Sequence, residues 1–215
     1  MTKLLIHVCC GTCGAWVPKK LSHDFDVTLF YFNPNIHPPE EYQYRLEGVK
    51  LMADELGLEL VEGEYDPQSW FEFVLRTGPT SVSLSNQHDR LISLRQGFGR
   101  QAPVDPKNEP EGGARCQLCF EHRLRATAEY ARDNKFDCFA TTLTVGRRKP
   151  ASKINPIGLR IASELGIEFL DRDFKKAGGE DLSQIRARDL GVYRQEYCGC
   201  VYSRLRGIDK RKLVK

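Results

Sequence analysis

Short apolar runs alternate along the chain with longer segments whose apolar residues recur every three or four positions. Residues 3–8 are a short apolar run and residues 25–32 are rich in β-branched and aromatic side chains, and both patterns are typical of buried strands. Residues 38–57 have apolar side chains at helical spacing and end on Gly57, a residue type common just past a helix. The beginning of the chain therefore predicts strands that are separated by helices.

The same alternation continues through the rest of the sequence. Further strands are predicted at residues 58–61, 136–143 and 167–170, and further helices at 13–21, 66–77, 116–134, 157–166 and 181–190. Strands that alternate with helices predict an α/β fold with a mostly parallel sheet. In such a fold ligands bind beyond the carboxyl ends of the strands, so residues that follow the strands are candidates for a site.

Length and composition narrow the class of protein. The chain has 215 residues, of which 40% are hydrophobic and 28% charged, as in an ordinary soluble domain. Its apolar runs are too short to cross a bilayer and its start lacks the pattern of a secretory signal, so we expect a cytoplasmic protein. We predict a single catalytic domain over 1–215, with a long loop insertion around 77–115, a helical turn at 91–94 and a basic C-terminal tail.

The candidate chemistry of the sequence is concentrated in its eight cysteines. Three clusters contain all but one of them: Cys9, Cys10 and Cys13; Cys116 and Cys119; Cys198 and Cys200. The remaining one, Cys138, lies inside a predicted strand and is expected in the core. In a reducing compartment, clustered thiols indicate metal binding or redox chemistry rather than structural disulfides.

The first two clusters fit one inorganic centre. Cys9 and Cys10 directly follow the first predicted strand, and Cys116 and Cys119 have C-x-x-C spacing at the start of a predicted helix. Thiolates are preferred ligands of zinc and of iron–sulfur clusters. By number of ligands, four thiolates match a cubane cluster and a structural zinc equally well. Their position at the ligand-binding edge of the sheet favours the cluster.

The third cluster and the basic residues suggest separate roles. A disulfide between Cys198 and Cys200 would close a small, strained and easily reduced ring, so this pair suits either a dithiol that cycles or two ligands of a second metal. Arg147 and Lys149 lie in a basic stretch that suits phosphate, although such stretches are more often solvated surface. No glycine-rich phosphate loop follows the first strand, which disfavours nucleotide hydrolysis.

Several motifs, taken together and in order, resemble those of one known family. They are His7-Val-Cys-Cys10, Tyr31-Phe-Asn-Pro-Asn-Ile36 followed by Glu41, Tyr42 and Arg45, the stretch 111–119, Thr141-Thr-Leu143 and the stretch 193–203. In these motifs the chain resembles epoxyqueuosine reductases of the QueH type. The resemblance implies a HUP-like three-layer α/β/α fold and a [4Fe–4S] cluster. It also implies the last step of queuosine synthesis, in which the epoxide of epoxyqueuosine at the wobble position of tRNA is reduced.

The same resemblance implies roles for individual residues. The expected cluster ligands are Cys9, Cys10, Cys116 and Cys119, and the expected redox-active pair is Cys198 and Cys200. Cys13 is a candidate ligand of an adjacent iron ion. The candidate contacts with the tRNA substrate are Asn33, Asn35, Tyr42, Arg45, Arg147, Lys149, Tyr193 and Arg194. An electron donor is required but not identified, and the oligomeric state stays open.

Opening an epoxide to an alkene and water requires two electrons, protons and an electrophile on the departing oxygen. We hypothesise that the iron site binds this oxygen while Cys198 and Cys200 supply the reducing equivalents. Two alternatives remain: a thiol-dependent tRNA-modifying transferase, and a non-catalytic RNA-binding module stabilised by zinc. Colour separates the zinc-stabilised module from the iron–sulfur enzyme, because an iron–sulfur protein is brown and a zinc protein is colourless.

Overall fold

Parallel strands run through the middle of the molecule. The computed structural model describes residues 1–75 and 109–205. Within these residues one five-stranded sheet has the order β3-β2-β1-β4-β5, and every neighbouring pair is parallel. The strands are β1 (Thr2–His7), β2 (Phe25–Tyr31), β3 (Glu59–Glu62), β4 (Cys138–Thr141) and β5 (Glu168–Phe169). The predicted α/β fold with a parallel sheet is confirmed.

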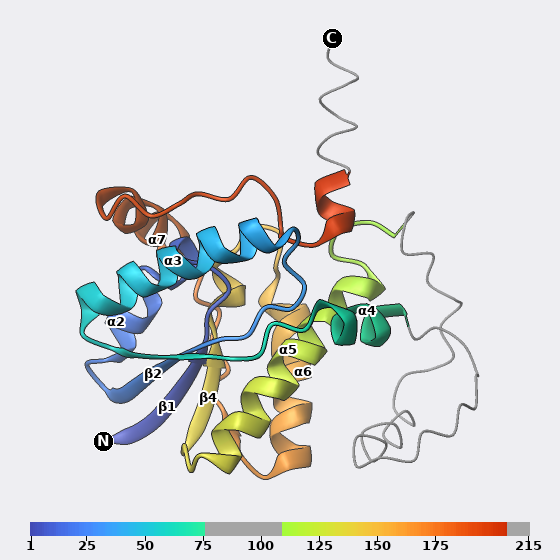
Figure 1. The fold of residues 1–215 in the computed structure, drawn as a ribbon. Helices are drawn as coiled ribbons and strands as arrows, with labels where there is room; N and C mark the ends of the chain where they lie inside the picture. The colour runs from blue at the N-terminus through green and yellow to red at the C-terminus, as the bar shows by residue number, and fades with distance from the viewer. Residues whose placement is uncertain (76–108, 206–215) are drawn as a thin grey trace.

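Helices connect the strands and flank the sheet. They are α1 (Gly11–Gly14), α2 (Val17–Leu21), α3 (Pro39–Leu56), α4 (Pro67–Leu75), α5 (Ala114–Asp133), α6 (Ala151–Leu165) and α7 (Gly179–Asp189), with the 3-10 helix η3 (Thr142–Val145) after β4. Residues 201–205 are helical as well. Figure 1 shows α3 and α7 on one side of the sheet and α5 and α6 on the other, so the sheet is covered on both faces.

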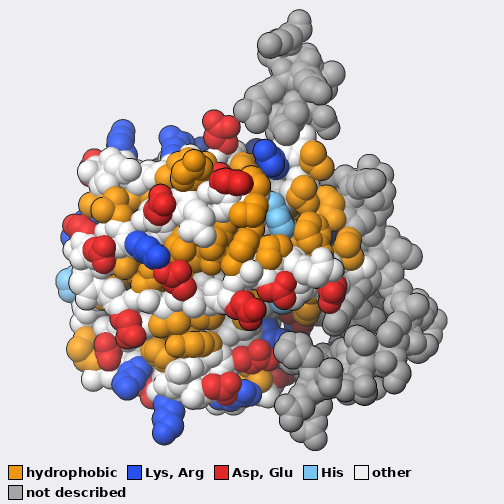
Figure 2. Space-filling view, viewed as in Figure 1, with side chains coloured by type: hydrophobic (Ala, Val, Ile, Leu, Met, Phe, Trp, Pro, Cys, Tyr) orange, Lys and Arg blue, Asp and Glu red, His pale blue; other side chains and the backbone are white. Residues whose placement is uncertain are grey.

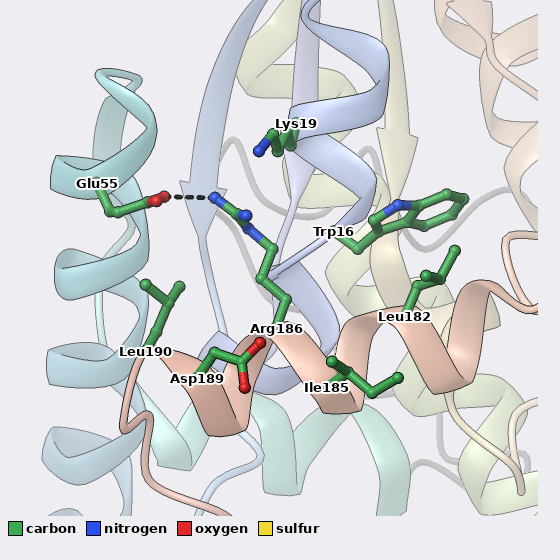
Figure 3. Close-up of a pocket in the computed structure, with 8 residues that line it drawn as sticks. All are labelled: Trp16, Lys19, Glu55, Leu182, Ile185, Arg186, Asp189 and Leu190. Atoms are coloured by element: carbon green, nitrogen blue, oxygen red, sulfur yellow. Dashed lines mark hydrogen bonds and ion pairs between the residues drawn. The ribbon is translucent and has the colours of Figure 1, made fainter.

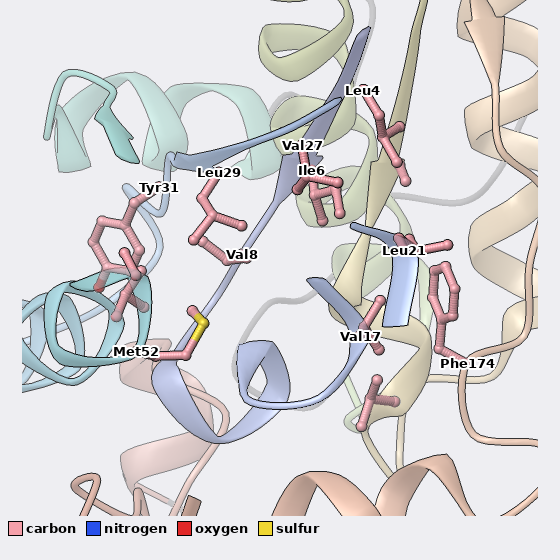
Figure 4. Close-up of a cluster of buried hydrophobic side chains, with 14 of the residues drawn as sticks. Leu4, Ile6, Val8, Val17, Leu21, Val27, Leu29, Tyr31, Met52 and Phe174 are labelled. Atoms are coloured by element: carbon pink, nitrogen blue, oxygen red, sulfur yellow. The ribbon is translucent and has the colours of Figure 1, made fainter. Parts of the chain in front are cut away.

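The side chains of β1 alternate between two hydrophobic clusters. Leu4 and Ile6 belong to the cluster drawn in Figure 4, which also contains Met52 of α3. Leu5 belongs to the other cluster, together with Leu124 of α5. This alternation is the one expected of a strand that is buried on both faces. Burial of each such side chain contributes about 1.5–3 kcal/mol, and the two clusters together hold the sheet whose edge carries the cysteines.

One predicted helix is divided in two. The pattern at 13–21 predicted a single helix, but the structure has the short helices α1 and α2, with Trp16 as the residue before α2. Pro18 lies in the first turn of α2. A proline is tolerated there because the first N–H groups of a helix have no partner within the helix. The prediction of one continuous helix was therefore wrong.

Another predicted helix begins earlier than expected. The pattern at 157–166 predicted its start at Ile157, whereas α6 begins at Ala151 and contains Pro156. A proline disfavours helical backbone at the residue before it and removes one hydrogen bond. Ile154 and Ile157 are both buried against the cluster that contains Leu124. Burial of this apolar face outweighs the cost of the proline.

Some predicted features lie outside the described residues. The predicted helical turn at 91–94, most of the loop insertion around 77–115 and the tail beyond 205 belong to this part of the chain, so they stay predictions. Over 1–75 and 109–205, no helix is at once long and apolar enough to reach across a bilayer.

Candidate metal centre

Three buried thiols lie together just after β1. The sulfur atoms of Cys9, Cys10 and Cys13, called the three-thiol group below, all lie within 4.8 Å of one another. The sulfurs of Cys9 and Cys10 are 3.8 Å apart. Two thiolates on one tetrahedral ion, with metal–sulfur bonds of about 2.3 Å, stand about 3.8 Å apart. The three-thiol group could therefore bind a metal ion or a metal cluster.

Local backbone structure produces this group. Cys10 is the N-cap of α1, and its sulfur accepts a hydrogen bond from the backbone N–H of Cys13 at 3.4 Å. A side-chain Cβ at Gly11 would lie only 2.5 Å from the carbonyl oxygen of Gly48 and 2.4 Å from a methyl group of Val192. Glycine at position 11 is therefore needed for α1 to approach α3 this closely. The contact fixes the cysteine-bearing turn against α3.

Hydrogen bonds among the three thiols shift their pKa values in different directions. Bonds from the thiols of Cys10 and Cys13 hold the pKa of Cys9 well below its ordinary value. The bond that Cys10 accepts from Cys13 lowers its pKa, but the bond that it donates to Cys9 and burial outweigh this and raise the pKa to about 11. The bonds that Cys13 donates to Cys10 and Cys9 raise its pKa well above the ordinary value. Hydrogen bonding within the group thus favours the thiolate at Cys9 over Cys10 and Cys13.

The C-x-x-C cysteines lie at the start of α5. Cys116 packs in the same hydrophobic cluster as the three-thiol group, and its sulfur accepts a hydrogen bond from the backbone N–H of Gly112 at 3.2 Å. Cys119 packs with Trp70 and Cys200. Within the described residues, neither joins the set of sulfurs that all lie within 4.8 Å of one another. The structure thus places Cys116 beside the first cysteine cluster and Cys119 beside the third.

The third cluster forms a tight turn before the helical residues 201–205. Gly199 has a φ of +113°, which favours glycine, and its carbonyl accepts a hydrogen bond from the backbone N–H of His37 at 2.8 Å. Cys198 is half-buried and Cys200 is buried, and both are free thiols. Burial and the neighbouring Cys198 sulfur raise the pKa of Cys200 to about 12. Cys200 therefore carries a proton at neutral pH.

A buried ion pair on α3 holds this turn. Arg45 donates hydrogen bonds to the carbonyl of Cys198 at 3.1 Å and to the carbonyl of Tyr197 at 3.0 Å. Glu41 pairs with Arg45 at 2.7 Å and accepts a hydrogen bond from the hydroxyl of Tyr193 at 2.8 Å. The donors of Arg45 are thus used within the chain, where they connect α3 to the redox-pair candidates.

Two cationic side chains lie among the cysteines. The ammonium of Lys149 is 4.0 Å from the sulfur of Cys9. Burial opposes its charge, but the sulfurs of Cys9 and Cys198 raise the pKa of Lys149 above its ordinary value. Burial likewise opposes the charge of Arg123, and its pKa is raised by sulfurs from all three clusters, those of Cys119, Cys9, Cys198 and Cys116. Sulfurs of all three clusters thus lie within electrostatic range of Arg123.

Gln195 and Arg123 each have a buried polar atom without a hydrogen-bond partner among the described residues. Gln195 donates from Nε2 to the sulfur of Cys10 at 3.0 Å, while its Oε1 is buried without a partner among the described residues. Nη2 of Arg123 is also buried and unpartnered within this part of the chain. Buried polar atoms in native proteins almost always have a partner. These two atoms indicate that a further group belongs between the cysteines.

His7 joins three parts of the sheet edge. Its Nε2 is 3.2 Å from the carbonyl oxygen of Phe32, and its Nδ1 is 3.0 Å from the hydroxyl of Thr141. Because a carbonyl only accepts, Nε2 carries the proton and Nδ1 accepts from Thr141. Burial and the charge of Arg123 lower the pKa of His7 to about 3, so the ring is neutral. His7 thus ties β1 to β4 and to the residue after β2.

Four predicted tRNA contacts lie in the interior. They are Asn33, Asn35, Tyr42 and Arg45, none of which is more than 4% exposed. Asn33 donates to the carbonyl of Val8 at 2.9 Å and accepts from Arg123 at 3.4 Å. The ring of Tyr42 packs against Tyr65, with the ring centroids 4.0 Å apart. In this structure these side chains support the site from inside.

Other predicted tRNA contacts are on the surface. Tyr193, Arg194 and Arg147 are exposed, and Arg147 pairs with Glu180 of α7. On the face shown in Figure 2, hydrophobic side chains gather near α4 and acidic side chains border them. Such a border does not attract a phosphate backbone. An RNA surface would therefore need Arg194, which is the exposed cation of the 193–194 segment, or cations of another face.

A surface pocket is separate from the cysteines (Figure 3). Its lining residues are Trp16, Lys19, Glu55, Leu182, Ile185, Arg186, Asp189 and Leu190. Arg186 of α7 forms an ion pair with Glu55 of α3 at 2.6 Å. No cysteine lines this pocket, so it does not coincide with the candidate metal centre.

Sequence reasoning missed two side chains of the site. Arg123 follows Cys119 by one helical turn, so helical spacing alone places both on one face of α5. That signal was available in the pattern. Gln195 reaches Cys10 across 185 positions of the chain, and no local pattern shows such a contact.

Comparisons with known proteins agree on one family. A family model described as epoxyqueuosine reductase QueH matches residues 4–84 and 95–206. A protein of that name from Streptococcus pyogenes serotype M1 is 34% identical over 213 residues, which is 99% of this chain and 74% of the relative. Another from Thermotoga maritima is 33% identical over 213 residues, covering 98% of this chain and 94% of the relative. One from Staphylococcus epidermidis is 29% identical over 220 residues, covering 99% and 81%.

The comparison with solved structures is weaker. The zinc-inhibited form of teicoplanin deacetylase Orf2 aligns with a TM-score of 0.39 and 11% identity, over 78% of this chain and 66% of that chain.

Proposed function

Because the chain belongs to the family of epoxyqueuosine reductase QueH, an oxidoreductase of queuosine biosynthesis, we propose that it reduces the epoxide of epoxyqueuosine at the wobble position of tRNA with an iron–sulfur cluster and a redox-active cysteine pair. The observation that supports this chemistry is the packing of the cysteine clusters, because Cys116 packs with the three-thiol group and Cys119 packs with Cys200. The proposal includes a HUP-like fold, for which the strand order β3-β2-β1-β4-β5 is the support.

The residues of the site fit an iron–sulfur cluster. In this proposal Cys9, Cys10, Cys116 and Cys119 hold a [4Fe–4S] cluster, and Cys13 is available for an adjacent iron ion. Hydrogen bonds from N–H groups to the sulfurs of Cys10 and Cys116 stabilise the thiolate form that such a cluster requires. The unpartnered Nη2 of Arg123 is a donor to which the sulfur atoms of such a cluster could offer an acceptor.

An iron–sulfur cluster, when bound, supplies one-electron transfer and Lewis-acidic iron. The dithiol of Cys198 and Cys200 matches the reaction in electrons and protons. Its oxidation to a disulfide releases two electrons and two protons, and the conversion of an epoxide to an alkene and water consumes the same number of each. Cys200 holds its proton at neutral pH because it is buried beside Cys198. An external donor then returns the disulfide to the dithiol.

The tRNA part of the proposal depends on access to this edge of the sheet. A wobble base can be splayed out of the anticodon loop at low cost and enter a pocket. Tyr193 and Arg194 are exposed, and the next residue, Gln195, already contacts the sulfur of Cys10. The surface beside the cysteines therefore offers an aromatic ring for stacking and a cation for phosphate. The remaining candidate contacts stay part of the proposal.

The test combines metal analysis with turnover. Protein purified without oxygen is expected to contain iron and sulfide and to convert epoxyqueuosine in tRNA to queuosine, measured by mass spectrometry of the nucleosides. Cys9→Ser is expected to lose iron. Cys198→Ser is expected to keep the iron–sulfur absorbance and lose turnover. Cys138→Ser is the matched control, because Cys138 is buried in β4 away from the three clusters, and it is expected to keep both.

Other outcomes point to other functions. A colourless zinc protein that binds tRNA without converting it would support the zinc-stabilised RNA-binding module. Turnover that needs a cysteine but no iron would support the thiol-dependent transferase. Loss of iron in Cys198→Ser would make Cys198 a metal ligand rather than a member of the redox pair.

A further inference from the structure

Arg123 is a buried cation without a carboxylate partner in the described part of the chain. It is 1% exposed and lies on α5 one turn after Cys119, whose carbonyl accepts from its Nε at 3.3 Å. Its Nη1 donates to Asn33 at 3.4 Å, and its Nη2 has no hydrogen-bond partner among these residues. No ion pair joins Arg123 to any Asp or Glu of 1–75 or 109–205. Its positive charge thus faces sulfur atoms and neutral amides.

Lys149 is a second cation beside the cysteines, and it is half-buried. Its ammonium has a contact with the sulfur of Cys9 at 4.0 Å, and within the described residues no carboxylate pairs with it. Its two preceding neighbours behave differently, because Arg147 pairs with Glu180 and Arg148 pairs with Glu111 at 3.0 Å. The basic stretch therefore contains two cations neutralised by carboxylates at the surface and one directed to the cysteines.

A buried charge must be balanced. An unpaired guanidinium in the interior is strongly disfavoured, so the fold tolerates the buried Arg123 and the half-buried Lys149 only if negative charge lies nearby. The nearby groups able to carry it are the cysteine sulfurs. A cluster held by four thiolates has a net negative charge that increases on reduction, and net charge is one of the factors that set its reduction potential. A fixed cation therefore stabilises the reduced form more than the oxidised form.

We propose that Arg123, supported by Lys149, is the counter-cation that raises the reduction potential of the iron–sulfur cluster, and that Asn33 orients its guanidinium toward the sulfurs. The proposal rests on the proposed function, since it requires the cluster. Arg123 acts on the cluster through its charge, so it is a positioning and tuning residue. Its hydrogen bonds to Asn33 and to the carbonyl of Cys119 keep that charge at a fixed place.

The test is a redox titration of the loaded protein, followed by electron paramagnetic resonance. Arg123→Met removes the charge, and Arg123→Lys keeps it. We expect Arg123→Met to lower the ratio of reduced to oxidised cluster at a fixed poise by tenfold or more, which is about 59 mV for a one-electron couple. Arg123→Lys is expected to recover most of this shift. A potential of Arg123→Met equal to that of the wild type would overturn the proposal.

Controls separate charge from folding. Arg125→Met is the matched control, because Arg125 is a buried arginine on the same helix that is paired with Glu164, and its potential is expected to be unchanged. If Arg123→Met does not fold or does not assemble the cluster, Lys149→Met is titrated in its place. A lower potential there supports the proposal and an unchanged one refutes it. Wild-type protein without iron and sulfide would instead refute the proposed function, and this proposal with it.

Discussion

Replacing Arg45 with methionine perturbs the connection between α3 and the Cys198 turn. The change removes the ion pair with Glu41 at 2.7 Å and two hydrogen bonds to the carbonyls of Tyr197 and Cys198. Removal of one partner from a buried pair costs about 3–5 kcal/mol, because the other charge stays buried. We expect the free energy of unfolding to fall by this amount, a large part of the roughly 5–15 kcal/mol of a typical domain.

The double variant E41Q/R45M separates the stranded charge from the lost hydrogen bonds. It removes the buried carboxylate as well, so it is expected to be more stable than R45M, with a coupling energy of about 0.5–3 kcal/mol. Lys50→Met is the matched control on the same helix, because Lys50 pairs with Glu62 at the surface, where the side chains are 50% and 44% exposed. Such a pair contributes about 0–1 kcal/mol.

Two assays measure the effect. Equilibrium unfolding in urea gives the free energies, and hydrogen exchange gives the local protection of the backbone at 193–203. In R45M the amides of this stretch should exchange faster. The protection of the β1 amides should fall only by the amount that the global free energy of unfolding falls. If R45M is no less stable than K50M, or if exchange at 193–203 matches the wild type, the α3 ion pair does not hold the turn and the reasoning is refuted.

Three further predictions concern backbone strain, RNA binding and pH. Gly199→Ala should lower the melting temperature, at a cost of about 1–3 kcal/mol, because φ is +113° and the new Cβ would lie 3.0 Å from Arg45. Gly57→Ala is the control, because a Cβ there would lie in open space, and it should destabilise the fold less. Equal destabilisation by the two changes would contradict the steric argument. Arg194→Ala should reduce the slope of log affinity for tRNA against log salt by about 1; an unchanged slope in fluorescence anisotropy would place the phosphate contact elsewhere. For Glu164, burial opposes the charge but hydrogen bonds from arginines lower its pKa below 4.5, so its contribution to stability is present above pH 4.5 and lost as the pH falls. Glu164→Gln should therefore melt below the wild type at pH 7 and converge with it in acid, and a constant difference across pH would argue against this.

The fold could be predicted because its signals are local. Residues 3–8 and 25–32 are mainly apolar, and the structure has β1 and β2 there because both faces of each strand are largely buried. The start of α6 could not be predicted, since Pro156 argues locally against a helix and only tertiary burial of Ile154 and Ile157 overrides it. Local rules thus failed where packing against another element decided the outcome.

The sequence predicted which cysteines belong to the candidate site, but it did not predict which charged side chains lie beside them. Cysteines that follow β1 and begin α5 were found from spacing and strand order. A charge run, however, does not show which side chain turns inward, and Lys149 rather than Arg147 or Arg148 lies beside Cys9. Arg45 gave the same difficulty, because its partners at 197 and 198 are more than 150 positions away.

The unequal burial of the C-x-C pair gives the proposed electron relay a direction. Seven of the eight cysteines are buried, and Cys198 is the half-buried one. Thiol–disulfide exchange requires the incoming thiolate to reach the sulfur it attacks. A soluble reductant would therefore form its mixed disulfide at Cys198, with Cys200 as the inner sulfur that resolves it. External electrons would therefore enter through the Sγ atom of Cys198, and alkylating this sulfur with a bulky reagent would prevent the dithiol from being regenerated.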